Sequence, residues 1–226
     1  MGSTSTILRT TANFTRHDRM SYCIVNESAG YVYLNIPKAA CTSLKLAIAE
    51  QAGVEFETLQ WNAPWRVPTR EAANRYADLY WFTFVRHPAA RLVSCWADWC
   101  NEPLPSEDNF EMNPAMRKFI GCPFATFADA VCSMSPELMN HHFQPQSDFF
   151  RHVLERKPDD VFRVVDINEA WPTIRGRFGL PRLPHARRSE HSPWREYYTE
   201  DLLAMVEHRY ADDYALGGYS LEAVTC

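Results

Sequence analysis

One short segment combines a lysine, small residues and two hydroxyl side chains, in the order Pro37, Lys38, Ala39, Ala40, Cys41, Thr42 and Ser43. Lys38 supplies a positive charge, and Thr42 and Ser43 supply hydroxyl donors. A helix that begins near Thr42 points its first backbone N–H groups, which lack partners inside the helix, at one spot in front of it. Such a spot attracts anions, phosphate above all. The segment is therefore a candidate phosphate-binding loop.

Arg86 and Ser94 form a second group with the chemistry of a phosphate site. Arg86 directly follows an apolar run, and Ser94 falls in the second turn of the helix predicted after it. A guanidinium offers a forked donor and a hydroxyl a short one, so the two side chains are suited to hold one phosphate together. The alternative is a surface ion pair between Arg86 and an acidic neighbour.

Both groups are predicted to lie at strand-to-helix junctions. Residues 31–36 read as a buried strand closed by Pro37, and a helix from about Thr42 ends near Gly53. Residues 79–85 are apolar on both faces, as is typical of a central parallel strand. Strands that alternate with helices in this way predict an α/β fold around a mainly parallel sheet.

The remaining elements are predicted from apolar spacing, caps and turn residues. We expect an edge strand at 21–25 and an irregular connection at 54–78, which ends in a short helix capped by Thr69. A surface excursion at 101–120 is followed by a helix at 124–132, a strand at 161–166 and a helix at 168–178 closed by Gly179. The last predicted element is an amphipathic helix that is capped by Thr199 and runs to Asp213, and its buried stripe consists of Leu202, Leu203, Met205, Val206 and Tyr210. The chain is expected to form a single domain, residues 1–226, in which residues 1–20 are a loosely ordered arm.

Composition narrows the class of protein. With 28 acidic and 23 basic residues the net charge is −5, which gives no general attraction to nucleic acid or to anionic membranes. No apolar run is long enough to span a membrane and no signal peptide is evident, so we expect a cytoplasmic location. Seven cysteines without framework spacing favour a reducing compartment. The oligomeric state stays open.

The candidate loop is not a Walker A motif, in which the lysine directly precedes the hydroxyl residue. It resembles instead the 5′-phosphosulfate loop of sulfotransferases that use 3′-phosphoadenosine 5′-phosphosulfate (PAPS), in the form found in carbohydrate sulfotransferases and their bacterial relatives. Residues 84–94 resemble the 3′-phosphate motif of the same proteins, including Arg91-Leu-Val-Ser94 of the carbohydrate branch. Residues 140–150 are similar to the His-Trp-x-Pro-Gln segment of chondroitin- and HNK-type enzymes, with His142 at the histidine position. The resemblance spans residues 30–219.

The resemblance implies a three-layer, P-loop-like domain that uses PAPS as donor, releases 3′-phosphoadenosine 5′-phosphate (PAP) and needs no metal. It implies that residues 37–43 hold the 5′-phosphate and that Lys38 stabilises the charge on the leaving phosphate. Arg86 and Ser94 would fix the 3′-phosphate. Arg188 occupies the place of a family segment that closes over the nucleotide, and it is expected to be a further phosphate contact.

The base that takes the acceptor proton is less well defined. His142 is the preferred candidate, because histidine takes up a proton near neutral pH. It is alternatively a residue that holds its loop by hydrogen bonds, or a simple substrate contact. Some heparan-type enzymes use a glutamate shortly after the first helix, where Glu55 and Glu57 lie in this chain.

A sulfotransferase of this branch is expected to act on a glycan or a glycosylated small molecule. Two other classes are weighed against it. A P-loop-type kinase or hydrolase, with Asp166 as a possible metal ligand, would turn over ATP with magnesium, but the Walker glycines are absent. A non-catalytic module that binds a nucleotide or a glycan is disfavoured because Lys38, Arg86 and Ser94 are all intact.

Overall fold

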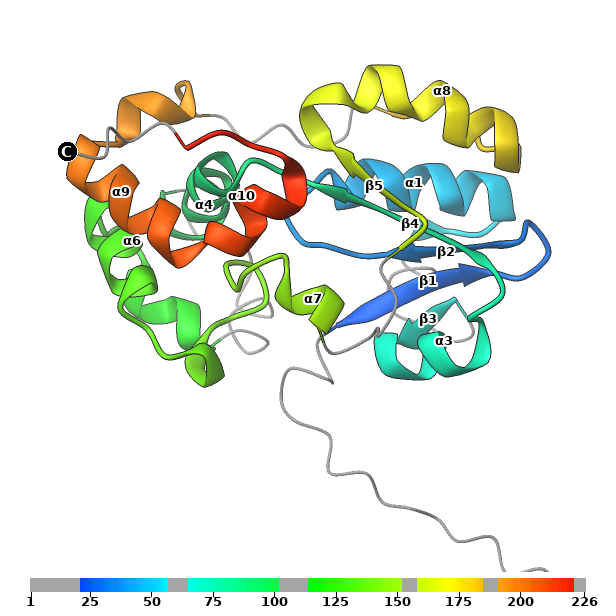
Figure 1. Ribbon diagram of the computed structural model, residues 1–226, viewed down its shortest axis with the longest axis horizontal. Coiled ribbons are helices and arrows are strands. Elements are labelled where there is room, and N and C mark those ends of the chain that lie inside the picture. Colours follow the sequence, from blue (N-terminus) through cyan, green and yellow to red (C-terminus); the bar gives the residue numbers. More distant parts are fainter. Residues whose placement is uncertain (1–20, 57–64, 102–113, 152–157, 185–190, 222–226) are drawn as a thin grey trace, which may run out of the picture.

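A computed structural model describes residues 21–56, 65–101, 114–151, 158–184 and 191–221. A five-stranded sheet in the order β3-β1-β2-β4-β5 lies beside a cluster of helices (Figure 1). The strands are β1 (Tyr22–Asn26), β2 (Tyr31–Leu34), β3 (Arg66–Pro68), β4 (Tyr80–Val85) and β5 (Asp160–Arg163). The expectation of a loose arm at residues 1–20 lies outside the described residues.

The sheet is mixed, so the expectation of a mainly parallel sheet is wrong in part. β4 pairs in parallel with β2 and β5, whereas β1 pairs antiparallel with both β2 and β3. A tight turn between β1 and β2 explains the reversal, because Gly30 adopts a φ of 80° and donates its N–H to Asn26 at 2.9 Å. The Asn26 side chain also accepts the backbone N–H of Ala29 at 3.0 Å.

The segment at 54–78 is more ordered than expected. It contains β3, which covers the outer side of β1, so β1 is not the edge strand that the sequence predicts. α3 (Thr69–Arg75) follows at once, and Pro68, not Thr69, is its N-cap. The Thr69 hydroxyl instead makes a 2.8 Å hydrogen bond with the Ser21 hydroxyl, which ties the helix to the start of β1.

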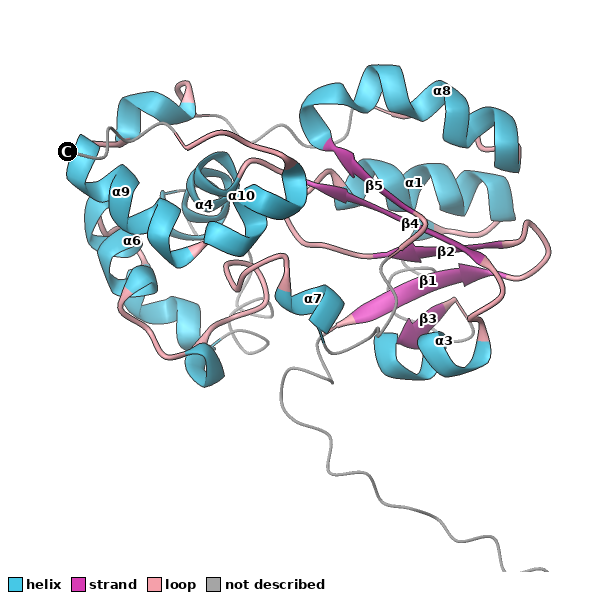
Figure 2. Ribbon diagram, in the orientation of Figure 1, coloured by secondary structure: helices cyan, strands magenta, loops and turns pink. Residues whose placement is uncertain are grey.

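Helices cover both faces of the sheet, which gives three layers (Figure 2). α1 (Cys41–Ala52) and α8 (Ile167–Phe178) pack on one face, where the buried side chains include Ile24, Tyr31, Tyr33, Leu44, Ile48, Phe82, Phe84, Trp171 and Ile174. α3 and α7 (Asp148–Arg151) contribute Ala72, Phe149 and Phe150 to the core of the other face. Both helices of the first face end in the predicted left-handed glycines, Gly53 and Gly179.

The helices beside the sheet share a separate core. They are α4 (Pro88–Trp96), α6 (Phe124–Cys132), α9 (Glu200–Arg209) and α10 (Ala211–Gly217), accompanied by short helices at Ala97–Asn101 (η1), Pro114–Phe119 (η2), Pro136–Leu138 (η3) and Trp194–Tyr197 (η5). A further short helix, η4 (Val164–Asp166), instead lies between β5 and α8. Pro88 opens α4 and α6 has its predicted bounds. In the described parts of the chain, no helix is both long and apolar enough to cross a membrane.

The predicted helix that ends at Asp213 is two helices. Thr199 caps α9 as expected, since its hydroxyl accepts the N–H of Leu202 at 3.3 Å. Tyr210 leaves the helical conformation, with φ −111°, and serves as the C-cap of α9 and the N-cap of α10. Its hydroxyl donates to the backbone carbonyl of Phe143 at 2.5 Å. The predicted stripe is also wrong at Met205, which is 38% exposed.

Candidate active site

The candidate phosphate loop connects β2 to α1 and contains two residues in the left-handed region, Lys38 with φ 65° and Ala40 with φ 60°. Ala40 is the N-cap of α1. The alanine side chain has no oxygen that could accept the first N–H groups of the helix, and the first turn of α1 carries no acidic residue. The amide end of α1 therefore faces the loop without a side-chain cap, which is the arrangement that binds an anion.

Arg91 holds this loop from behind. Its buried guanidinium donates Nε–H to the carbonyl of Pro37 at 3.0 Å, and Nη1 and Nη2 to the carbonyls of Gln144 and His141 at 2.7 and 3.2 Å. Burial lowers the pKa of Arg91, and the nearby Asp213 carboxylate opposes that effect. One side chain thus fixes the phosphate loop and the segment that carries His142 relative to each other.

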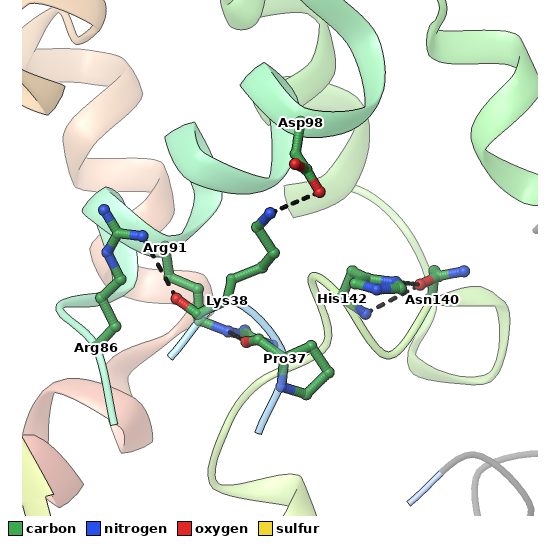
Figure 3. A network of polar contacts seen from close by, with 7 residues as sticks. All are labelled: Pro37, Lys38, Arg86, Arg91, Asp98, Asn140 and His142. Carbon is green, nitrogen blue, oxygen red and sulfur yellow. Dashed lines mark hydrogen bonds and ion pairs between the residues drawn. The ribbon is translucent and has the colours of Figure 1, made fainter. Parts of the chain in front are cut away.

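Arg86 lies at the carboxyl end of β4, as predicted. Its Nη1 donates to the carbonyl of Lys38 at 3.4 Å, so the guanidinium reaches the phosphate loop (Figure 3). Burial lowers the pKa of Arg86 to about 10, which still leaves it cationic at neutral pH. Ser94 lies in α4 and is 2% exposed. The structure therefore brings Arg86 to the loop and places Ser94 on the helix that follows it.

Gln146 and Asp213 together fix the backbone of Arg86. The Gln146 amide donates to the Arg86 carbonyl at 2.8 Å and accepts the Arg86 N–H at 2.9 Å. The buried Asp213 carboxylate accepts the backbone N–H groups of Gln146 and Ser147 at 2.7 and 2.8 Å. Burial raises the pKa of Asp213, while these two N–H groups act in the opposite direction. α10 therefore positions the segment on which both Arg86 and His142 depend.

His142 is oriented by Asn140. The Asn140 Oδ1 atom accepts the backbone N–H of His142 at 2.9 Å and lies 2.8 Å from His142 Nδ1 (Figure 3). An atom that accepts a backbone N–H is an oxygen, so Nδ1 must carry the proton and Nε2 must carry the lone pair. Burial lowers the pKa of His142 well below its usual value, and the charges of His141, Lys38 and Arg91 add to this effect. His142 is thus a neutral imidazole with its lone pair on Nε2.

Lys38 makes an ion pair that the sequence does not predict. Its Nζ atom lies 2.8 Å from the carboxylate of Asp98, which belongs to the π-helix η1 directly after α4. The side chain of Lys38 is only 13% exposed. The Lys38 ammonium therefore points away from the Arg86 guanidinium (Figure 3).

The other candidates lie elsewhere. Glu55 is exposed beyond the C-terminal end of α1, the end opposite the phosphate loop. Glu57 and Arg188 lie outside the described residues. Within the described ranges, no group of three or more His, Cys, Asp and Glu side chains could hold a metal ion.

Four residues of the site were not singled out from the sequence: Asp98, Asn140, Gln146 and Asp213. Asn140 could have been recognised from the local sequence, because the side chain of an asparagine often accepts the backbone N–H of the residue two positions later, which here is His142. Asp213 could not, since its partners Gln146 and Ser147 are 67 and 66 residues away. Asp98 lies in a π-turn, which apolar periodicity does not reveal.

Comparison with known proteins identifies the family of the chain. The family model described as "Sulfotransferase family" matches residues 21–220. The chain belongs to the sulfotransferase family. Carbohydrate sulfotransferase 14 of Danio rerio is 23% identical over 252 residues, which cover 93% of this chain and 65% of that relative. The chain thus spans slightly less than two thirds of the length of that relative, and no solved structure matches it.

The resemblance to carbohydrate sulfotransferases is confirmed by these two matches. The matched range contains the phosphate loop, Arg86, Ser94 and His142. The structure of this family member shows a mixed α/β fold with a five-stranded sheet flanked by helices. Family membership implies that the fold is P-loop-like.

Proposed function

We propose that this protein transfers a sulfuryl group from PAPS to a hydroxyl group of a carbohydrate or a glycosylated small molecule. The observation that carries the proposal is the loop between β2 and α1. It joins a helix N-terminus without a side-chain cap to Lys38 and to the guanidinium of Arg86, which lies 3.4 Å from the Lys38 carbonyl. An anion-binding helix end beside two cations suits a donor with several phosphate charges.

The donor is held from two sides. The N–H groups of residues 39–43, with the hydroxyls of Thr42 and Ser43, bind the 5′-phosphate. Arg86 and Ser94 bind the 3′-phosphate, the group that distinguishes PAPS from ATP. Arg188 is a further proposed phosphate contact. The charge of the loop suits a phosphate, because the first turn of α1 contains no acidic residue that would repel it.

The reaction is an in-line displacement at sulfur. The acceptor oxygen forms a bond to sulfur as the bond from sulfur to the bridging oxygen breaks, and PAP leaves. Lys38 stabilises the negative charge that grows on the bridging oxygen. The acceptor proton passes to Nε2 of His142, the atom that carries the lone pair in the tautomer fixed by Asn140. As in phosphoryl transfer, positioning and charge stabilisation account for most of the catalysis.

The acceptor class rests on the family. The relative from Danio rerio is named a carbohydrate sulfotransferase, which favours a sugar hydroxyl as the acceptor. The proposal makes no use of a metal ion. A kinase or hydrolase of the P-loop type would instead require magnesium and ATP.

The donor site is tested by calorimetric titration with PAP and with ADP. We expect PAP to bind more tightly than ADP, because Arg86 and Ser94 contact the 3′-phosphate. Arg86→Ala should weaken PAP binding by about 10- to 100-fold, as expected for the loss of a hydrogen bond between charged groups, and should remove most of the preference over ADP. Arg75→Ala is the matched control, because Arg75 is an exposed arginine of α3 paired with Glu71.

Equal binding of PAP and ADP by the wild type, or no binding of either, would contradict the proposal. That result would favour a P-loop-type kinase or hydrolase, which magnesium-dependent ATP turnover would then identify. PAP binding without sulfuryl transfer to any acceptor in a broad screen would indicate the non-catalytic module instead.

A further inference from the structure

Lys38 is restrained at both of its ends. Its backbone adopts a φ of 65°, and its carbonyl accepts a hydrogen bond from Arg86 at 3.4 Å. The preceding carbonyl, of Pro37, is held by Arg91 at 3.0 Å. The ammonium group is held separately, by the Asp98 carboxylate at 2.8 Å (Figure 3). The position of the ammonium therefore depends on Asp98.

Asp98 is itself held in place by its neighbours. It lies in η1, a π-helix of five residues, and π-turns inside helices occur frequently at functional sites. Residues on both sides of Asp98 are tied to a second segment, because the Trp96 indole Nε1–H donates to the Cys122 carbonyl at 2.9 Å and the Cys100 carbonyl accepts the Gly121 N–H at 2.8 Å. The carboxylate is thus presented to Lys38 by a fixed turn.

The ion pair is partly shielded from water. The two side chains are 13% and 33% exposed, so water screens them only partly. A phosphate at the amide end of α1 brings negative charge to the same loop. Asp98 then faces an anion of like charge, and the two compete for the Lys38 ammonium.

We propose that Asp98 is a positioning residue that restrains the Lys38 ammonium in the donor-free protein and gives it up when the 5′-phosphate of the donor binds. This inference rests on the proposed donor site. Each donor that binds must replace Asp98 at Lys38, so Asp98 lowers donor affinity while it keeps the lysine ordered. No covalent step is involved, because only the partner of the ammonium changes.

A double-mutant cycle measures the competition, with PAP as the titrant in calorimetry. Asp98→Asn should bind PAP about fivefold more tightly than the wild type, the change expected when an opposing partner of a partly buried ion pair is removed. In a Lys38→Met background the same substitution should change PAP affinity less than about twofold, because the ammonium that Asp98 restrains is gone. Asp98→Glu should return PAP affinity to near the wild-type value. Asp129→Asn, on an exposed position of α6, is the matched control and should change nothing.

A second measurement needs no nucleotide. Acetic anhydride modifies lysine side chains that it can reach, so mass spectrometry of the labelled protein reports how firmly Lys38 is held. We expect Lys38 to be acetylated about fivefold faster in Asp98→Asn than in the wild type, because the side chain is then no longer held against the Asp98 carboxylate. Circular dichroism checks that each variant is folded.

Three results would overturn the inference: unchanged or weaker PAP binding by Asp98→Asn, an equal gain in the Lys38→Met background, or unchanged acetylation of Lys38. Failure of the proposed function looks different. In that case the wild type shows no preference for PAP over ADP, while acetylation of Lys38 still responds to Asp98.

Discussion

His142 is the residue whose chemistry depends most on its immediate neighbour. Asn140 accepts two hydrogen bonds from it, one from the backbone and one from Nδ1, and this directs the lone pair to Nε2. Burial and surrounding positive charge lower the pKa of His142, which keeps the imidazole neutral. A neutral imidazole of fixed tautomer is ready to accept a proton without prior deprotonation.

These features give a prediction for catalysis. His142→Gln should lower kcat by about 100-fold or more, the usual contribution of a general base, and should leave PAP affinity within about twofold. Asn140→Ala should lower kcat by about tenfold, because Nδ1 loses the partner that fixes the tautomer. The acid limb of the wild-type kcat profile should lie below pH 6.5, the ordinary pKa of histidine, because the pKa of His142 is lowered.

Sulfuryl transfer measured across pH with a saturating donor tests these expectations. His208→Gln, an exposed histidine of α9, is the control and should behave as the wild type. A His142→Gln enzyme of normal kcat would show that another group takes the proton. Glu57 would then be the next residue to substitute.

The loop before α1 carries strain at the level of an element. Ala40 has a φ of 60°, which an alanine adopts at a cost of about 1–2 kcal/mol relative to a right-handed conformation. Glycine adopts that conformation without the steric cost, although it loses more freedom on folding. Strain at such a position is typical of binding sites, where the backbone must present its N–H groups in one direction.

We therefore expect Ala40→Gly to raise the free energy of unfolding by about 0.5–1 kcal/mol, the strain relieved minus the added chain entropy. Urea unfolding followed by circular dichroism measures it. Ala204→Gly, in the exposed middle of α9, should instead lower the free energy of unfolding by about 1 kcal/mol. A loss at both positions would mean that Ala40 is not strained.

Element prediction from the sequence succeeded where the signals are local. Gly53, Gly179, Thr199 and Pro88 mark helix ends through their own backbone or side-chain chemistry, and all four lie at the predicted ends. It failed where pairing decides the outcome. β3 has three residues and ends in proline, so only its antiparallel partner β1 makes it a strand. The break at Tyr210 depends on a contact with Phe143, which is 67 residues away.

The candidate site divides in the same way. Lys38 and Arg86 could be found because each lies at a strand-to-helix junction that the local pattern predicts. Asp98 and Asp213 could not be found, because their roles depend on contacts between segments that are distant in sequence. Arg91 was recognised only as part of a family motif, and its three backbone carbonyl partners emerge only from the fold.

At the scale of the whole molecule, the half-buried His141 makes stability depend on pH. Burial lowers the pKa of His141 to about 4, and the charges of Arg91, Arg66 and Lys45 add to this effect. In the unfolded chain a histidine has a pKa of about 6.5. Between these two values the unfolded state binds a proton that the folded state does not, so stability is complete above about pH 6.5 and falls as the pH is lowered.

The expected loss from His141 between about pH 6.5 and pH 5 is about 2 kcal/mol, since each pH unit contributes about 1.4 kcal/mol for one proton. Urea unfolding at the two pH values measures it. His141→Gln should be about 2 kcal/mol less sensitive to this change than the wild type, whereas His208→Gln should keep the wild-type dependence. Equal slopes for all three proteins would show that His141 is protonated in the folded state.

The last helix also has a consequence for the order in which the protein matures. Asp213 fixes the backbone at Gln146 and Ser147, and the Tyr219 hydroxyl donates to the carbonyl of Val85, next to Arg86, at 3.3 Å. Translation proceeds from the amino end, so the candidate phosphate loop emerges from the ribosome before Gln146, Asp213 and Tyr219. The part of the site that is synthesised first is therefore completed only after α10 and Tyr219 have emerged. A growing chain that has not reached these residues carries the phosphate loop without the contacts that fix the backbone around Arg86.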